Sequence, residues 1–71
     1  MNAPHHPTLH GSNHLQLLKI SEVAALTAMH RATIYRRIAE GAFPAAIQIT
    51  KRCVRWRASD VEHWLKTRPQ A

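Results

Sequence analysis

The spacing of apolar residues along the chain changes from helical to strand-like and back, and each change marks a predicted element. From Leu15 the residues LQLLKI are mostly apolar and lead into Ser21, a residue type favoured at helix N-caps. Glu22 follows in the first turn, where a carboxylate favours the positive end of the helix dipole. Val23 and Leu26 lie three positions apart, which puts them on one face of a helix. This pattern predicts a short first helix that begins after Ser21.

A second helix is predicted over about 31–40, after a break of a few residues. Ile34 and Ile38 are four positions apart and therefore point to the same side, toward the core. Gly41 stands where a residue in the left-handed conformation commonly ends a helix. Pro44 prevents the helix from resuming. The two short helices and their tight connection are typical of a helix-turn-helix unit.

The next segment alternates with period two on both sides of Lys51-Arg52, which predicts a β-hairpin. One face is predicted to be core and to carry Ile47, Ile49, Val54 and Trp56. The opposite face and the tip are basic. The turn contains no Asn-Gly or Asp-Gly pair, so the register of the two strands is not fixed by the sequence.

The last helix has the clearest start signal, because Ser59 and Glu62 have the spacing of a capping box. Val61, Trp64 and Leu65 form its inward stripe, and Pro69 stops it. The resulting fold class is mainly α with a small β-hairpin, in the order helix-helix-strand-strand-helix of a winged helix-turn-helix. The predicted core consists of Val23, Leu26, Ile34, Ile38, Ile47, Ile49, Val54, Trp56, Val61, Trp64 and Leu65.

Residues 1–14 are predicted to be a disordered tail, and the folded domain is predicted over 15–68. The tail has Pro, Gly and Ser, no apolar periodicity, and four of the six histidines. These histidines have no cysteine or carboxylate beside them and no spacing of a known metal site, so we predict no metal and no cofactor.

Length and charge narrow the class of protein further. A chain of 71 residues allows one domain, and its single cysteine, Cys53, excludes an intrachain disulfide. The apolar runs are shorter than the roughly 20 residues of a membrane span, and the N-terminus lacks the features of a secretory signal. The segment from Arg31 to Arg57 holds seven cations and one acid, so the formal net charge of +6 lies entirely within it.

Such a local excess of positive charge favours a polyanionic partner, of which nucleic acid is the commonest. We predict that the helix at 30–40 enters the major groove of double-stranded DNA and that the hairpin at 46–57 is a wing on the flanking backbone or minor groove. The predicted DNA-binding residues of the helix are His30, Arg31, Thr33, Tyr35, Arg36 and Arg37; those of the wing are Lys51, Arg52, Arg55 and Arg57.

Several alternatives remain open for individual residues. Arg36 or Arg37 has the spacing to pair with Glu40 instead of contacting a base, and His30 is a candidate N-cap. Arg55 and Arg57 are candidates for structural ion pairs, with Glu22 or Asp60 as the partner of Arg55. The two tryptophans lie on apolar stripes, which favours the core over base stacking. No nucleophile, base and orienting group come together in the pattern, so we predict no enzyme and no small-molecule substrate.

The stretch LLKISEVAALTAMHRATIYRRIAEGAFP, followed by VRW and the capping-box pattern, resembles the AlpA family of prophage regulatory proteins. These are small winged-helix relatives of the MerR DNA-binding domain and of phage excisionases, and the resemblance covers Leu17 to about Leu65. It implies a bacterial or phage origin, a site of action on DNA in the bacterial cytoplasm, and sequence-specific control of a prophage or integrative element. The chain departs from the family in the turn, where Ala28, Met29 and His30 replace the usual Gly, Leu and Ser. If Ala28 needs a positive φ, it costs about 1 kcal/mol relative to glycine.

The resemblance leaves two roles open: transcriptional regulation, and excisionase action that bends an attachment site. A module this small makes few base contacts, so we also expect several copies to bind adjacent sites cooperatively. A more distant alternative is a protein-interaction module, which predicts an exposed apolar patch. Since nearly every large apolar residue has a predicted core position, this alternative ranks below DNA binding.

Overall fold

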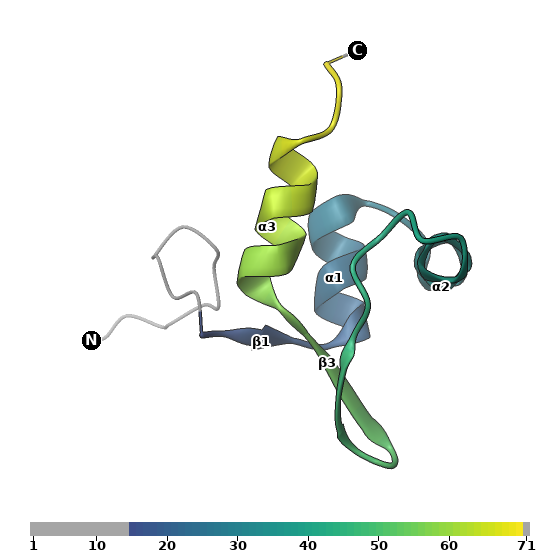
Figure 1. The fold of residues 1–71 in the computed structure, drawn as a ribbon, viewed down its shortest axis with the longest axis vertical. Coiled ribbons are helices and arrows are strands. Elements are labelled where there is room, and N and C mark those ends of the chain that lie inside the picture. The colour runs from purple at the N-terminus through teal and green to yellow at the C-terminus, as the bar shows by residue number, and fades with distance from the viewer. Residues whose placement is uncertain (1–14, 71) are drawn as a thin grey trace.

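The computed structural model describes residues 15–70, and in it three helices pack around a small three-stranded antiparallel sheet (Figure 1). The predicted order of helices and hairpin is confirmed, with one extra strand at the start. The tail predicted over 1–14 lies outside the described residues. The elements are β1 (Leu17–Leu18), α1 (Ile20–Thr27), α2 (Arg31–Ala39), β2 (Ile47–Thr50), β3 (Cys53–Arg57) and α3 (Ala58–Lys66).

Strand β1 was not predicted from the sequence, because two residues are too few to show an alternating pattern. It pairs with the C-terminal half of β3, with Leu17 opposite Arg57 and Leu18 opposite Trp56. The backbone N–H of Ala58 adds a hydrogen bond to the carbonyl of Gln16 at 2.9 Å. As a result β3 is the central strand of the order β1-β3-β2.

Helix α1 begins earlier than predicted. Its N-cap is Lys19, and Ser21 lies inside the first turn, so the predicted N-cap at Ser21 is wrong. The Glu22 carboxylate accepts a hydrogen bond from the backbone N–H of Lys19 at 2.8 Å. This bond uses the acid at the third helical position and the backbone of the N-cap residue, so the N-cap side chain is not needed for it. A lysine can therefore occupy the N-cap.

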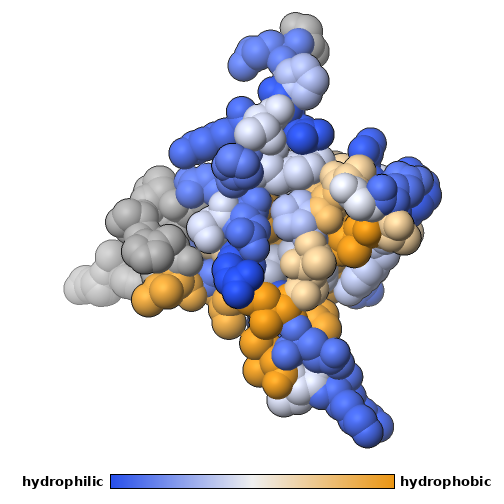
Figure 2. Space-filling view, viewed as in Figure 1, coloured by the Kyte–Doolittle hydropathy of each residue, from blue (hydrophilic) through white to orange (hydrophobic). Residues whose placement is uncertain are grey.

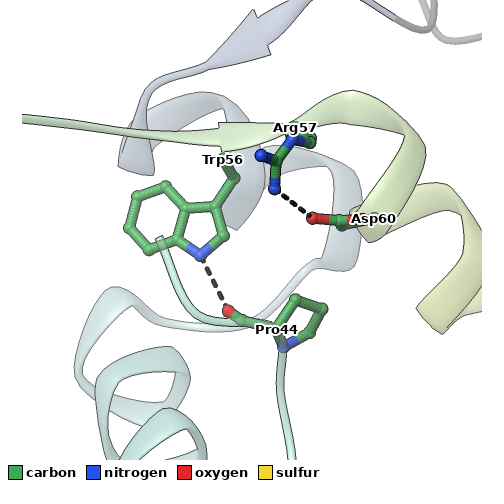
Figure 3. A network of polar contacts seen from close by, with 4 residues as sticks. All are labelled: Pro44, Trp56, Arg57 and Asp60. Atoms are coloured by element: carbon green, nitrogen blue, oxygen red, sulfur yellow. Dashed lines mark hydrogen bonds and ion pairs between the residues drawn. The ribbon is translucent and has the colours of Figure 1, made fainter. Parts of the chain in front are cut away.

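Helix α3 also begins earlier, at Ala58, and its N-cap is Arg57. The Ser59–Glu62 capping box is therefore wrong, because Ser59 is already helical and offers no capping hydrogen bond at this end. Arg57 instead forms an ion pair with Asp60, with 3.5 Å between Nη1 and Oδ2 (Figure 3). The start of α3 directly after β3 draws Ala58 into the core, where only 2% of its surface is exposed.

The connection between α1 and α2 contains a left-handed residue that is not glycine. Ala28 has φ 58° and ψ 29° and caps the C-terminus of α1, as the sequence comparison with the family implied. The hydroxyl of Thr27 donates to the carbonyl of Val23 at 2.8 Å and accepts from the backbone N–H of Met29 at 3.3 Å. Thr27 thus satisfies backbone groups on both sides of the turn.

Trp56 and Trp64 both hold the loop that follows α2. The indole N–H of Trp56 donates to the carbonyl of Pro44 at 3.0 Å (Figure 3), and that of Trp64 donates to the carbonyl of Ala42 at 2.9 Å. Phe43 lies between Ala42 and Pro44 in this loop, and its ring meets the ring of Trp64 edge-on, with 4.8 Å between centroids. The interpretation of both tryptophans as structural residues is consistent with these contacts.

The buried core only partly matches the predicted one. Four predicted residues are fully buried, namely Val23, Ile34, Trp56 and Val61, and four others pack partly buried against them, namely Ile38, Val54, Trp64 and Leu65. Leu26 and Ile49 were predicted to be core and are exposed, at 42% and 48% of their surfaces, and Ile47 is only half-buried. The core residues that the sequence pattern missed are Leu18, Phe43 and Ala58.

The reason for the error at the hairpin is its register. Ile47 lies opposite Arg55 and Gln48 lies opposite Val54, and residues directly opposite each other share a face of the sheet. The predicted face of Ile47, Ile49, Val54 and Trp56 is therefore wrong: Val54 and Trp56 face the core, while Ile47 faces out with Arg55. The register shifts between Gln48 and Thr50, which makes Ile49 an extra residue on β2.

Candidate nucleic-acid interface

The outer face of α2 carries most of the helical residues predicted to bind DNA. Arg31, Tyr35 and Arg36 are exposed, and Thr33 is half-buried. Ile34 is completely buried on the opposite face and fixes the helix against the core. The predicted inward placement of Ile34 and Ile38 is confirmed, and Arg31 and Arg36 face outward as predicted.

His30 is exposed at the N-cap of α2, and its side chain makes no capping hydrogen bond. Its backbone carbonyl accepts the N–H of Ile34 at 3.1 Å, so the cap is formed by the main chain. The imidazole therefore stands free of capping contacts beside Arg31, at the end of α2 where the helix dipole is positive.

The remaining cation of α2, Arg37, is half-buried in the last turn. Its Nε is buried and has no hydrogen-bond partner among the described residues. Within residues 15–70 the single ion pair is Arg57–Asp60, so the pairing of Arg36 or Arg37 with Glu40 is not formed. The guanidinium groups of Arg36 and Arg37 therefore have no ion pair with Glu40.

Lys51 and Arg52 form the tip of the β2–β3 hairpin, which projects away from the helices (Figure 1). Both side chains are exposed. Neither residue has a positive φ, so the turn is not the type I′ or II′ that two-residue hairpins favour. The side-chain amide of Gln48 donates to the carbonyl of Lys51 at 3.4 Å, and the N–H of Arg52 donates to the hydroxyl of Thr50 at 3.3 Å. The bulge at Ile49 and these two bonds shape the turn without glycine.

Arg55 and Arg57 lie on the outer face of β3 rather than at the tip. Nη1 of Arg55 donates to the carbonyl of its neighbour Val54 at 2.8 Å, so the side chain lies along its own strand. It does not pair with Glu22 or Asp60, and the ion pair with Asp60 is made by Arg57. The structure thus brings the tip cations together and keeps these two arginines on the sheet.

Helix α2 and the hairpin meet at an aromatic contact. The ring of Tyr35 on α2 lies 6.1 Å from the ring of Trp56 on β3, at an angle of 58°. Tyr35 is 47% exposed, whereas Trp56 is fully buried. Tyr35 therefore reaches from the surface of α2 to the base of the wing, a role that its place in the sequence pattern did not reveal.

Residues 15–70 form no cluster of potential metal ligands. In this range no three His, Cys, Asp or Glu side chains come together as metal ligands, and Cys53 is half-buried and free. The four histidines of the N-terminal segment lie outside the described residues. Also within this range, no helix has the length and apolar character needed to cross a membrane.

An open hollow of about 460 Å³ lies between α3 and the loop after α2. Its floor is formed by Phe43, Pro44 and Trp64, and its rim by His63 and Arg68. The guanidinium of Arg68 lies over the Trp64 ring at 4.3 Å from the centroid, an arrangement that a cation–π attraction stabilises.

Comparison with known proteins gives two findings. Residues 16–69 match the family model described as prophage CP4-57 regulatory protein (AlpA). The chain is also 34% identical over 53 residues to an uncharacterized protein, ORF88, of Enterobacteria phage P4. This alignment covers 75% of the chain but only 60% of the phage protein, so the chain matches less than two thirds of that relative's length. No solved structure matches the chain significantly.

Proposed function

The chain belongs to the AlpA family of prophage regulatory proteins, and from that premise we propose that it is a sequence-specific double-stranded DNA-binding protein that regulates transcription of a prophage or integrative element. It acts on DNA in the bacterial cytoplasm and uses no cofactor. The observation that carries the proposal is the placement of exposed cations on two projecting parts, the outer face of α2 and the tip of the hairpin.

Helix α2 is the part that enters the major groove. The groove admits one α-helix, and the first turns of a recognition helix meet the base edges. Arg31 and Arg36 are both exposed on α2, and arginine pairs bidentately with guanine. Thr33 and Tyr35 supply a methyl and a phenol at the same face. His30 and Arg37 flank this face and contact the phosphates.

The hairpin is the wing. Lys51 and Arg52 at its tip contact the flanking backbone or the minor groove, because an exposed lysine or arginine adds an attraction for phosphate wherever it reaches the duplex. Arg55 and Arg57 contribute to the same field from the face of β3, although their guanidinium groups are held by Val54 and Asp60. The wing therefore adds affinity, whereas α2 adds sequence discrimination.

The direct test selects binding sites for the full chain from a random duplex pool and then measures affinity for the selected site across a salt series. If about six phosphates are neutralised, log K should fall against log salt with a slope of about −5. Affinity that does not change with salt, or no binding to any duplex at low salt, would refute the proposal.

Matched variants separate base contacts from charge. Arg36→Ala should lower affinity for the selected site by about 5- to 150-fold, which corresponds to the 1–3 kcal/mol of a bidentate pair. It should lower affinity for unrelated duplexes much less. Lys66→Ala removes the same charge from an exposed position on α3 and should leave the selected-to-unrelated ratio unchanged. Equal effects of the two substitutions would contradict the assignment of α2 as the recognition helix.

The same selection distinguishes regulation from excision. Sites within promoters support transcriptional regulation, and arrays that flank an attachment site support the excisionase role, in which the protein bends DNA to favour recombination. Both roles use the same fold, so the position of the sites in the genome decides between them.

A further inference from the structure

The outer face of the sheet carries an apolar strip that no described residue covers. We define the outer strip as Leu15, Leu17, Ile47 and Ile49. Leu15 is 80% exposed, Leu17 43% and Ile49 48%, and Ile47 is half-buried. Figure 2 shows hydrophobic colour gathered along β1 and the stem of the hairpin, above a hydrophilic tip. The prediction that nearly every large apolar residue lies in the core is wrong at this strip. An exposed apolar patch is the feature that a protein-interaction surface predicts.

The strand register places two of these residues, Leu17 and Ile47, on the same face of the sheet. Leu17 lies opposite Arg57 on one side of β3, and Ile47 lies opposite Arg55 on the other. The face therefore runs from leucine across two arginines to isoleucine. The aliphatic stems of the arginines continue the apolar surface between the two edges.

The charge of this face is lower than its sequence implies. The guanidinium of Arg57 is paired with Asp60 at 3.5 Å, and that of Arg55 is turned onto the carbonyl of Val54 at 2.8 Å. Of these two arginines, Arg57 has a carboxylate partner and Arg55 has none among the described residues. Such a surface can approach another weakly charged apolar surface without bringing several free cations together.

We propose that the outer strip is the contact between two copies of this chain bound to neighbouring sites on DNA. The proposal rests on the proposed function and adds the surface through which copies cooperate. The contact joins the strip of one copy to the strip of the other around a two-fold axis, because an apolar strip is complementary to itself. A two-fold contact predicts that the paired sites form an inverted repeat.

The size of the strip indicates that DNA is needed for the contact. Stable interfaces bury about 800 Å² per partner and involve roughly 20–30 residues a side. Four aliphatic side chains, three of them about half-exposed or less, fall well short of that. Two copies held on one duplex have an effective concentration near millimolar, at which a weak contact is populated. The chain should therefore be monomeric alone and coupled on DNA.

The location of the strip is compatible with both copies remaining on DNA. Leu17 lies in β1 and Leu15 two residues before it. Strand β1 pairs with the end of β3 farthest from the Lys51-Arg52 tip. The tip and α2 consequently stay available for the duplex while β1 meets the neighbouring copy. Among the strip residues, only Ile49 lies close to the tip.

The experiment measures binding of the full chain to three duplexes: one site, two sites as an inverted repeat, and two sites as a direct repeat, each over a series of spacings. We expect coupling of about tenfold on the inverted repeat, recurring at spacings about one helical turn, or 10–10.5 base pairs, apart. Leu17→Ser should reduce the coupling to near onefold and leave single-site affinity within twofold. The matched control is Leu26→Ser, since Leu26 is 42% exposed on α1, outside the strip; it should retain the coupling.

Each other outcome is informative. Coupling that survives Leu17→Ser, or that Leu26→Ser abolishes equally, would overturn the assignment of the strip, provided that thermal unfolding shows both variants folded. Coupling only on direct repeats would overturn the two-fold contact, and a stable dimer in sedimentation without DNA would overturn its dependence on DNA. Single-site binding without coupling refutes this inference alone. No binding to the single-site duplex refutes the proposed function and this inference with it.

Discussion

Ala28 is the most informative single position for the stability of the fold, because it holds a left-handed conformation without being glycine. Its φ is 58°, and among the described residues no other non-glycine has a positive φ. The conformation is imposed by the turn between α1 and α2, which must place α2 across α1. Ala28→Gly should therefore stabilise the protein.

The size of the effect follows from two opposing terms. An L-residue in the left-handed region costs about 1–2 kcal/mol relative to the right-handed region, because its Cβ crowds the following carbonyl. Glycine avoids that cost but loses about 0.4–1 kcal/mol more conformational entropy on folding. The difference between these terms predicts that Ala28→Gly raises the free energy of unfolding by about 1 kcal/mol. In a domain of 60–100 residues this corresponds to an increase in Tm of about 4–8 °C.

Chemical and thermal unfolding followed by circular dichroism measure this difference directly. Ala25→Gly is the matched control, since Ala25 is exposed within α1 and the substitution should cost about 1 kcal/mol. Gly41→Ala is the converse test: φ at Gly41 is 74° and a Cβ there meets no atom within 4 Å. Its expected cost of about 1 kcal/mol is therefore due to backbone conformation alone. If Ala28→Gly lowers stability or matches Ala25→Gly, the argument from backbone strain is refuted.

The remaining predictions concern the helix start, the loop and the core, and equilibrium unfolding in urea measures each. Glu22→Ala should lower the free energy of unfolding by about 1 kcal/mol, because it removes the acceptor for the N–H of Lys19. Glu62→Ala should lower it by less than half of that amount, because the capping box predicted for α3 is not formed. A larger loss at Glu62 would contradict the observed helix start. Trp64→Phe should cost about 1–2 kcal/mol, since the carbonyl that receives its indole N–H at 2.9 Å loses its donor; an unchanged midpoint would mean that water replaces that bond. Ile34→Ala should lower the free energy of unfolding by about 2–5 kcal/mol, because the side chain is completely buried. This is a large part of the roughly 4–10 kcal/mol of stability expected for the whole domain. A loss below 1 kcal/mol would contradict the burial of Ile34.

The sequence was sufficient for the features that depend on local pattern. The i, i+4 spacing of Ile34 and Ile38 placed α2 and its inward face, and Gly41 ended the helix in the left-handed conformation as expected. The period-two segments around Lys51-Arg52 identified both strands of the hairpin. These features need no knowledge of distant residues, because helix periodicity and turn chemistry operate within a few positions.

The helix starts were harder to predict, because more than one residue near each start is a competent cap. Ser21 and Ser59 have the favoured side chain, yet the N-caps are Lys19 and Arg57, each two residues earlier. In each case pairing in the sheet constrains the start of the helix: Leu18, two residues before α1, is paired with Trp56, and Ala58, the first residue of α3, donates its backbone N–H to the carbonyl of Gln16. Tertiary pairing of β1 with β3 therefore sets where the helices begin, and the sequence pattern of either helix alone does not contain it.

The hairpin register shows the same limit at the candidate site. An alternating segment fixes which residues share a face within one strand, but not which face of its partner strand they join. The bulge at Ile49 shifts the register by one residue, so Ile47 shares a face with Arg55 instead of Val54. A sequence without a glycine turn gives no signal for that bulge. The shift moves Ile47 from the predicted core face to the outer face of the sheet.

The arrangement of the basic residues depends on buried aromatic contacts. Trp56 lies on the wing strand, donates a hydrogen bond to the loop that follows α2, and meets the ring of Tyr35 on α2 itself. A single buried side chain thus links the helix that carries Arg31 and Arg36 to the hairpin that carries the tip cations. These contacts of Trp56 hold the two positively charged parts at a fixed distance in the free protein. Under the proposed function, this fixed spacing requires less ordering on binding to a duplex than two independent basic segments would.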